Sequence, residues 1–136
     1  MTLRFVIYTD GAARGNPGPA AIGAVLYADS GGELKPAATI SEAIGDTTNN
    51  VAEYRAVVAA LHAARDAGAL DVELRSDSQL LVRQLTGAYR VKATHLQPLH
   101  AEALAVAAHF DRFTVRHVFR EENSEADALA NAALDR

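Results

Sequence analysis

Apolar and polar positions divide this chain into two halves with different patterns. The first half holds three β-rich runs, at residues 3–8, 20–27 and 33–43, and short sequences rich in Gly, Pro and Ser separate them. Strands joined by short turns favour antiparallel pairing, so we expect an antiparallel meander here. Pro36 places the third strand at an edge of the sheet or near a strand end, because proline donates no backbone hydrogen bond.

The second half alternates helical patterns with short apolar runs. Helices are predicted at residues 51–68, 78–86, 98–110 and 124–134, and strands at residues 72–75 and 113–119. This alternation predicts parallel strands joined by helical crossovers. The complete order is β-β-β-α-β-α-α-β-α. We therefore expect an α/β fold with one mixed five-stranded sheet, in which three antiparallel strands precede the parallel ones, as a single domain over residues 1–136.

Composition narrows the possible classes of protein. The chain has 136 residues and no cysteine, which excludes a disulfide framework and a thiolate metal site. No apolar run is long enough to span a bilayer, and the first residues fit a strand better than a signal peptide. We therefore expect a cytoplasmic protein without membrane contact. No obligate protein partner is evident, and a monomer is the default expectation.

The net charge and the local distribution of charge point in opposite directions on nucleic-acid binding. The formal net charge of −4 argues against a generally basic binder of nucleic acids. Residues 78–101, however, contain no Asp or Glu, while Arg83, Arg90 and Lys92 lie within them. This stretch is either a local basic surface or a helix and loop with a solvated basic edge, and charge alone does not separate the two interpretations.

Four acidic residues lie where the chain changes secondary structure. Asp10 follows the end of the first predicted strand and Asp77 the end of the fourth, and ligands of open α/β sheets gather beyond such carboxyl ends. If these strands are neighbours, the two carboxylates converge. Glu53 is expected in the first turn of its helix and Asp127 at the start of the last helix, so both can reach the same edge of the sheet.

Each acid alone also has a structural explanation, as a turn residue or a helix cap. The four together indicate a site for hard cations, because packed carboxylates repel one another and Mg²⁺ removes that repulsion. Two such ions about 3.5–4 Å apart can activate water, bind both sides of a scissile phosphate and stabilise the leaving oxygen. The sequence therefore favours a metal-dependent nuclease.

In order and spacing, the segments YTDGAARGNPGP, TTNNVAEY, SDSQL and REENSEAD resemble those of the type 1 ribonuclease H family, and the resemblance covers nearly the whole chain. It is nearest to compact archaeal and bacterial members. The resemblance implies a ribonuclease H-like fold and endonucleolytic cleavage of the RNA strand of an RNA·DNA hybrid, leaving 5′-phosphate and 3′-hydroxyl ends. It also implies that Asp10, Glu53, Asp77 and Asp127 hold two Mg²⁺ (or Mn²⁺) ions, with Asp10 bridging them. One ion would orient the attacking water, and the other would neutralise charge on the departing 3′ oxygen.

The resemblance also indicates substrate-binding residues. Matching positions are Asn16, Asn49, Asn50 and Gln79, with Thr48 as a contact to a phosphate of the DNA strand. Side-chain amides can donate and accept across a minor groove, where ribose hydroxyls distinguish RNA from DNA. Turn formation by Asn16 and helix capping by Asn49 and Asn50 are the structural alternatives. We favour substrate contact for Asn50 and Gln79.

Two features depart from the best-known bacterial pattern. No Lys/Arg-rich extra helix separates the helices at 78–86 and 98–110, and Tyr89, Arg90 and Lys92 form a reduced substitute, which predicts modest and salt-sensitive affinity.

The second departure is a shorter loop where the family carries a catalytic histidine. His117 lies ten residues before Asp127, but alignment of the strands puts His117 inside the strand and Arg120 where the loop begins. Either residue can reach the leaving phosphate or a displaced metal, and we favour Arg120.

Two alternative functions remain open from the sequence alone. One is a relaxed nuclease that also cuts double-stranded RNA, since both duplexes present a wide minor groove with ribose hydroxyls. The other is an inactive nucleic-acid-binding module on the same fold, although such a module would usually have lost one of the acids.

Overall fold

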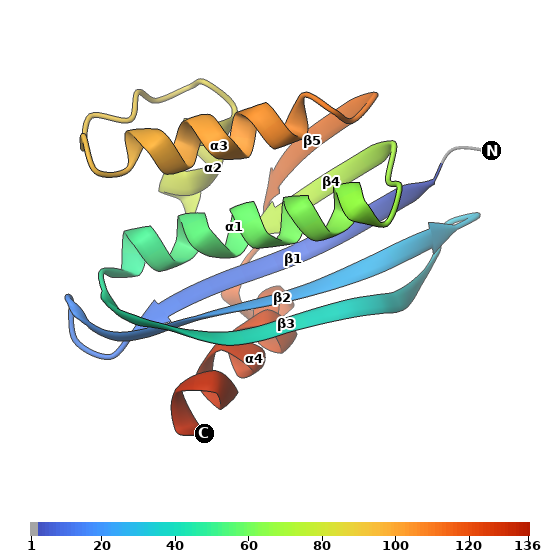
Figure 1. Ribbon diagram of the computed structural model, residues 1–136. Coiled ribbons are helices and arrows are strands. Elements are labelled where there is room, and N and C mark those ends of the chain that lie inside the picture. Colours follow the sequence, from blue (N-terminus) through green and yellow to red (C-terminus); the bar gives the residue numbers. More distant parts are fainter. Residues whose placement is uncertain (1–2) are drawn as a thin grey trace.

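Five strands form one mixed sheet (Figure 1). The computed structural model describes residues 3–136. The strands are β1 (Arg4–Ala13), β2 (Gly18–Ser30), β3 (Glu33–Thr47), β4 (Asp71–Ser76) and β5 (Arg112–His117). Their order across the sheet is β3-β2-β1-β4-β5; β2 pairs antiparallel with β1 and β3, and β4 pairs parallel with β1 and β5. The predicted antiparallel meander and parallel second half are confirmed.

Four α-helices accompany the sheet in the predicted order. They are α1 (Asn49–Asp66), α2 (Gln79–Leu85), α3 (Gln97–Ala107) and α4 (Ser124–Asp135). A short 3-10 helix, η1 (Arg120–Asn123), precedes α4 and was not predicted. The order β-β-β-α-β-α-α-β-α is otherwise confirmed.

The strand ends differ from those that the hydrophobic pattern predicted. β1 continues through polar positions to Ala13, because its ladder with β2 needs only backbone groups, and this register sets Asp10 opposite Gly23. β3, which contains Pro36, is an edge strand as predicted. β5 stops at His117, two residues before its predicted end at 119, because the chain turns there into η1.

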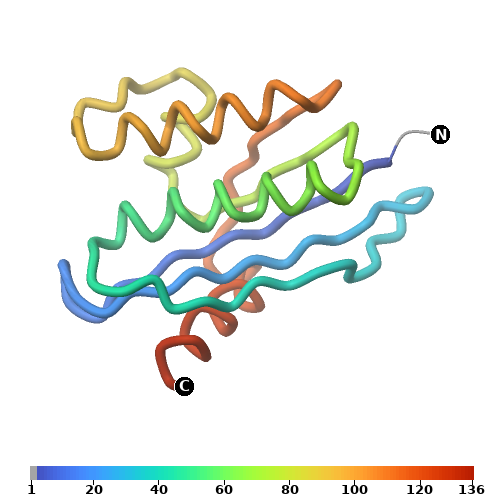
Figure 2. Tube along the Cα trace, in the orientation of Figure 1, coloured from blue at the N-terminus to red at the C-terminus, as the bar shows by residue number. Residues whose placement is uncertain are grey.

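Helices cover both faces of the sheet. In Figures 1 and 2, α1, α2 and α3 lie on one face, and α4 lies on the other. The larger core is on the first face and includes Ile7, Leu61 and Leu74, all fully buried. On the second face, Ala126 and Ala130 of α4 are also fully buried. Within residues 3–136, no helix is both long enough and apolar enough to cross a membrane.

Two glycines allow helices to approach the sheet closely. A Cβ atom at Gly11 would lie 2.2–2.4 Å from backbone atoms of Ala52 and Glu53 in α1, and one at Gly23 would lie 2.2 Å from the carbonyl oxygen of Ala126 in α4. Real Cβ atoms essentially never come within 3.0 Å of such atoms, so no larger residue fits at either position without moving a helix. α1 and α4 therefore meet β1 and β2 at adjacent rungs of the ladder, beside Asp10.

Candidate active site

Strand register brings Asp10 and Asp77 to corresponding positions. The last parallel pair between β1 and β4 is Tyr8 with Arg75, and two residues further along the chain lie Asp10, still within β1, and Asp77, one residue past the end of β4. The predicted convergence of neighbouring strands one and four is therefore confirmed. The expectation that Asp10 follows the strand end was wrong, since β1 continues beyond it by pairing with β2 alone.

The close contacts of α1 and α4 with the sheet bring the other two acids, Glu53 and Asp127, to the same place. Gly11 brings the α1 backbone onto β1 at Glu53, and Gly23 brings α4 onto β2 one residue before Asp127. Glu53 lies in the second turn of α1, not in the first as predicted, because the helix begins at Asn49, two residues before its predicted start. Asp127 lies in the first turn of α4, as predicted.

All four carboxylates line one cavity of about 300 Å³. Its lining consists of Asp10, Gly11, Ala12, Asn49, Glu53, Asp77, Arg120 and Asp127. Asp10, Glu53 and Asp77 are half-buried, whereas Asp127 is exposed. The acids come from four separate segments of the chain, so it is the fold that brings them together.

Burial and like charge make Asp10 and Glu53 hard to ionise. Burial, together with the neighbouring carboxylates of Asp77, Asp127 and Glu53, raises the pKa of Asp10 to about 8, and burial is the largest of these causes. Burial also raises the pKa of Glu53, with Asp77 adding to the effect and a hydrogen bond from Ser78 opposing it. Uncompensated negative charge therefore accumulates around Asp10.

The donor set fits a hard divalent cation. It offers carboxylate oxygens and no sulfur, which matches the preference of Mg²⁺ for a few carboxylates supplemented by waters and phosphate oxygens. The acids do not form a closed coordination shell by themselves: between residues 3 and 136, no three acidic or histidine side chains are arranged to hold an ion. A cation with incomplete protein ligation suits this open arrangement, and its charge would relieve the repulsion that raises the pKa of Asp10.

Arg120 and His117 line a neighbouring cavity of about 310 Å³, which shares Glu53 and Asp77 with the first. Arg120 is the exposed first residue of η1 and lines both cavities. His117 is the last residue of β5, where it pairs with Ser76 of β4. The structure thus places His117 in the strand and Arg120 three residues later, in a 3-10 helix rather than an open loop.

Asn123 is a site-supporting residue that the sequence did not reveal. Its side chain is 1% exposed, and its Nδ2 donates to the carbonyl oxygen of Thr9 over 2.9 Å. This bond ties the start of α4 to β1 one residue before Asp10. In a single sequence, nothing distinguishes Asn123 from other polar residues near a helix start.

The asparagines near the α1 N-terminus take part in backbone hydrogen bonds. The Oδ1 of Asn49 accepts from the Ala13 N–H (2.8 Å), and the Asn49 N–H donates to Oδ1 of Asn16 (3.1 Å). The Thr48 hydroxyl caps α1 by accepting from the Val51 N–H (3.2 Å). Thr48 is therefore the helix cap, whereas Asn49 and Asn16 use their side-chain oxygens to connect the start of α1 to the end of β1 and to the turn that follows it.

Comparison with known proteins identifies the family. A family model described as "Reverse transcriptase-like" matches residues 8–133. The chain is 50% identical over 128 residues, 94% of its length, to a ribonuclease HI of Halobacterium salinarum. It is 36% identical over 148 aligned positions to a ribonuclease H of Anaplasma marginale, with 98% of this chain and 92% of that protein covered. The chain belongs to the type 1 ribonuclease H family.

Solved ribonuclease H1 structures share the fold. The crystal structure of RNase H1 from Halobacterium salinarum NRC-1 matches with a TM-score of 0.92 at 49% identity, covering 97% of this chain and 98% of that one. LC11-RNase H1, solved in complex with an RNA/DNA hybrid, matches with a TM-score of 0.88 at 41% identity over 96% of each chain. By length, the present chain spans 63% of the Halobacterium salinarum relative and 36% of three mycobacterial ones.

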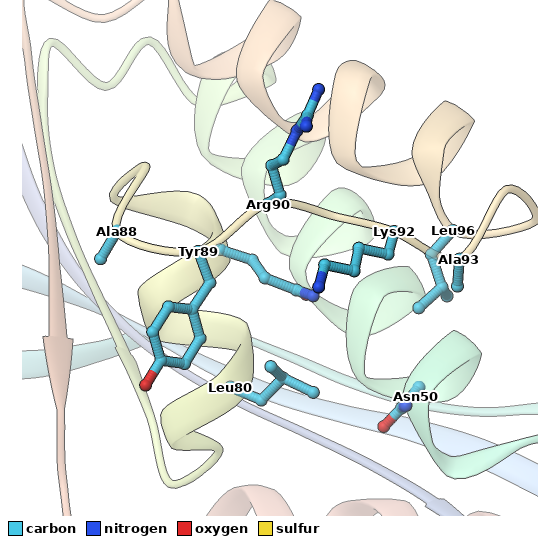
Figure 3. A pocket seen from close by; sticks show the side chains of 9 residues that line it. Asn50, Leu80, Ala88, Tyr89, Arg90, Lys92, Ala93 and Leu96 are labelled. Carbon is cyan, nitrogen blue, oxygen red and sulfur yellow. The ribbon is translucent and has the colours of Figure 1, made fainter.

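This ribonuclease H has a further hollow of about 670 Å³ between α1, α2 and the connection to α3 (Figure 3). Asn50, Tyr89, Arg90 and Lys92 line it, together with Leu80, Gln84, Ala88, Ala93 and Leu96. In Figure 3, Lys92 points towards the interior of the hollow, whereas Arg90 extends away from Asn50 and Leu80. Four of the predicted substrate residues therefore line the hollow, and one of them, Arg90, directs its side chain away from Asn50 and Leu80.

Two contacts define the rim of that hollow. The Tyr89 hydroxyl accepts a hydrogen bond from the Arg83 guanidinium (2.5 Å), whose Cζ lies 5.2 Å from the centre of the tyrosine ring. Arg83 thus fixes the ring while adding positive charge beside it. Gln79, the exposed first residue of α2, lies next to Asp77 and outside the lining of the hollow.

Proposed function

We propose that this chain is an endoribonuclease that cleaves the RNA strand of RNA·DNA hybrids by metal-dependent hydrolysis, leaving 5′-phosphate and 3′-hydroxyl ends. The observation that carries the proposal is the cavity in which carboxylates from four separate segments meet. A fold alone does not establish catalysis, but a complete set of acids at the expected edge of the sheet supports it. The choice of substrate draws on the LC11 relative, whose structure contains an RNA/DNA hybrid.

In this proposal, Asp10, Glu53, Asp77 and Asp127 hold two Mg²⁺ ions, for which Mn²⁺ can substitute. Asp10 would be the central ligand, since the other three carboxylates all lie near enough to act on its pKa. Bound there, the cations supply positive charge for the scissile phosphate and the leaving oxygen. Because the pKa of Asp10 is about 8 in the absence of cations, binding at neutral pH releases its proton.

Arg120 is proposed to contact the phosphate on the leaving side. Its guanidinium is a permanent cation, and the residue lines both cavities that contain Glu53 and Asp77. A charge-assisted hydrogen bond from this group would stabilise negative charge that develops on a departing oxygen. His117 lines only the second cavity, and its backbone lies within the β4–β5 ladder, so it is the weaker candidate.

Polar side chains on either side of the acids are proposed to hold the hybrid. Asn50 and Gln79 are exposed, and their amides can bind ribose hydroxyls in the minor groove. Thr48, Asn16 and Asn49 cluster at the N-terminus of α1, where the helix dipole favours a phosphate of the DNA strand.

Tyr89, Lys92 and Arg90 are proposed to take the place of the absent basic helix. They border the hollow beside Asn50, so a nucleic-acid strand bound by Asn50 would extend across the hollow. With so few cations at this surface and a net charge of −4, binding is expected to be modest and sensitive to salt.

The deciding experiment is cleavage of a labelled RNA·DNA hybrid with Mg²⁺, compared with EDTA and with single-stranded RNA, duplex DNA and double-stranded RNA. We expect metal-dependent cutting of the RNA strand in the hybrid only. Comparable cutting of double-stranded RNA would indicate the relaxed nuclease instead. Folded protein that cuts nothing with either Mg²⁺ or Mn²⁺ would indicate a binding module.

Asp10→Asn provides the matched inactive variant. It keeps the shape of the side chain but removes its charge, so we expect cleavage to fall by roughly a hundredfold or more while the fold and hybrid binding persist. Circular dichroism and hybrid binding by fluorescence anisotropy check the second part. A wild-type cleavage rate in this variant would defeat the metal-ligand assignment. The single-domain organisation, monomeric state and cytoplasmic location stay predictions.

A further inference from the structure

Phe119 is an unusually exposed aromatic side chain beside the acids. Its relative exposure is 68%, whereas every other exposed large apolar side chain among residues 3–136 is at most 47% exposed. Leaving an aromatic ring in water forgoes the free energy of its burial. A single exposed apolar residue needs no explanation by itself, so its position and support decide whether it matters.

Phe119 lines the cavity that also contains Glu53, Asp77 and Arg120. It therefore lies at the mouth of the proposed active site, one residue before the guanidinium proposed to contact phosphate. The ring of His117 meets the Phe119 ring edge-on at a centroid distance of 5.6 Å. A substrate that brings a phosphate to Asp77 must pass close to this ring.

The backbone holds Phe119 in a fixed place. Its N–H donates to the Glu122 carboxylate (3.2 Å), and its carbonyl accepts from the Glu122 N–H (2.9 Å). The preceding residue, Val118, is 2% exposed and donates its N–H to the Ser76 carbonyl (2.9 Å). Asn123 anchors the other end of the segment to β1. A well-anchored segment thus holds the ring at the surface. A partner that covers the ring therefore loses little binding free energy to the ordering of this segment.

We propose that Phe119 is a positioning residue for the RNA strand, with its ring packed against the ribose of the nucleotide beside the scissile phosphate. This inference rests on the proposed function. In a paired duplex each base is already stacked on its neighbours, so a protein ring at the groove meets the sugar and not a base face. The ring offers an apolar surface to the ribose carbons while Arg120 and the acids contact the adjacent phosphate.

The test is steady-state cleavage of the hybrid by wild type, Phe119→Ala and Phe119→Trp. Packing made equally in the ground state and the transition state changes KM and leaves kcat alone. We expect Phe119→Ala to raise KM by roughly tenfold with kcat within about twofold, and Phe119→Trp to restore KM. The slope of log affinity against log salt should stay unchanged in Phe119→Ala, because no phosphate contact is lost.

Leu104→Ala is the matched control, since Leu104 is also an exposed apolar residue (39%) but lies on α3 and lines neither acid-containing cavity. It should leave KM unchanged. An unchanged KM in Phe119→Ala, a fall in kcat alone, or equal impairment by Ala and Trp would each overturn the inference. If the wild-type protein itself cuts no hybrid, the proposed function fails and this inference with it, whereas with an active wild type these outcomes bear on Phe119 alone.

Discussion

At the scale of single residues, the proposed metal site makes Asp10 the group that responds to both protons and cations. It is half-buried, and its carboxylate faces three others, so the neutral form is favoured until a cation arrives. The same arrangement that favours metal binding destabilises the ionised, metal-free protein. Stability and cation affinity are therefore coupled through this one carboxyl group.

We expect the thermal stability of the metal-free protein to fall as pH rises from about 5 to about 9. The pKa of Asp10 is raised from 3.8 to about 8 on folding, so the folded state holds this proton more tightly than the unfolded chain. That stabilisation is complete below about pH 4 and is lost as pH rises through about 8. Melting curves in EDTA measure the decline, and saturating Mg²⁺ should largely remove it.

Asp10→Asn is the control for this pH dependence. The variant carries no titrating group at this position, so its melting temperature in EDTA should vary less between about pH 5 and about pH 9. A wild-type curve as flat as that of the variant would contradict the expectation.

Arg120→Ala is expected to slow turnover by about a hundredfold, and His117→Ala by less than about tenfold. Arg120 lines both cavities beside the acids, while His117 lines one of them. Single-turnover cleavage with saturating enzyme isolates the chemical step in each variant. A larger loss in His117→Ala would show that the imidazole, despite its place at the end of β5, takes the role that we assign to Arg120.

At the scale of elements, the site depends on two helices that press on neighbouring strands. α1 meets β1 at Gly11, and α4 meets β2 at Gly23, which pairs with Asp10. Each contact brings a helical acid within reach of a strand acid. Helix position is therefore set by the absence of a side chain in the sheet as much as by apolar packing.

Gly23→Ala should destabilise the protein by about 1–3 kcal/mol and reduce cleavage, because its Cβ would displace α4 and with it Asp127. Chemical denaturation and the hybrid assay measure the two effects. Gly31→Ala is the comparison: nothing lies within 4 Å of its Cβ, but its φ of +66° disfavours alanine. It should lose about 1 kcal/mol and keep full activity. Equal behaviour of the two variants would argue against a role for the Gly23 contact.

Local sequence patterns predicted the elements but not how closely they approach. Apolar periodicity marked every strand and α-helix, and short turns and crossovers predicted which strands are antiparallel and which are parallel, but not their order across the sheet. The prediction from apolar periodicity failed at the end of β1, because backbone pairing with β2 continues through polar residues. It also failed at η1, which has no hydrophobic repeat. The Asn123 bond to Thr9 joins residues 114 positions apart, and no local pattern encodes such a contact.

At the scale of the whole molecule, the proposed function requires a protein with a net charge of −4 to hold a polyanion. The four carboxylates of the site line one cavity, whereas a second hollow is lined by Lys92 and Arg90, with Arg83 beside Tyr89 at its rim. Affinity should therefore depend on few phosphate contacts, and each lost cation should be detectable in the salt dependence.

Lys92→Ala should lower the magnitude of the slope of log affinity against log salt by about 1, and Arg90→Ala should change it less. The reason is orientation, since Lys92 points into the hollow and Arg90 away from it (Figure 3). Titrating hybrid into Asp10→Asn protein at several salt concentrations gives the slopes without cleavage. Equal slopes for both variants would mean that the nucleic acid does not bind across the hollow.

The hollow beside α1 and α2 is bordered largely by residues 88–96, a connection that contributes no carboxylate to the acid cavity. Insertions or deletions in this connection would leave the strand register and both glycine contacts untouched. Evolution, or an engineer, can therefore alter the grip on nucleic acid without altering the chemistry. A longer, more basic segment placed there is a direct route to a tighter-binding enzyme with the same catalytic centre.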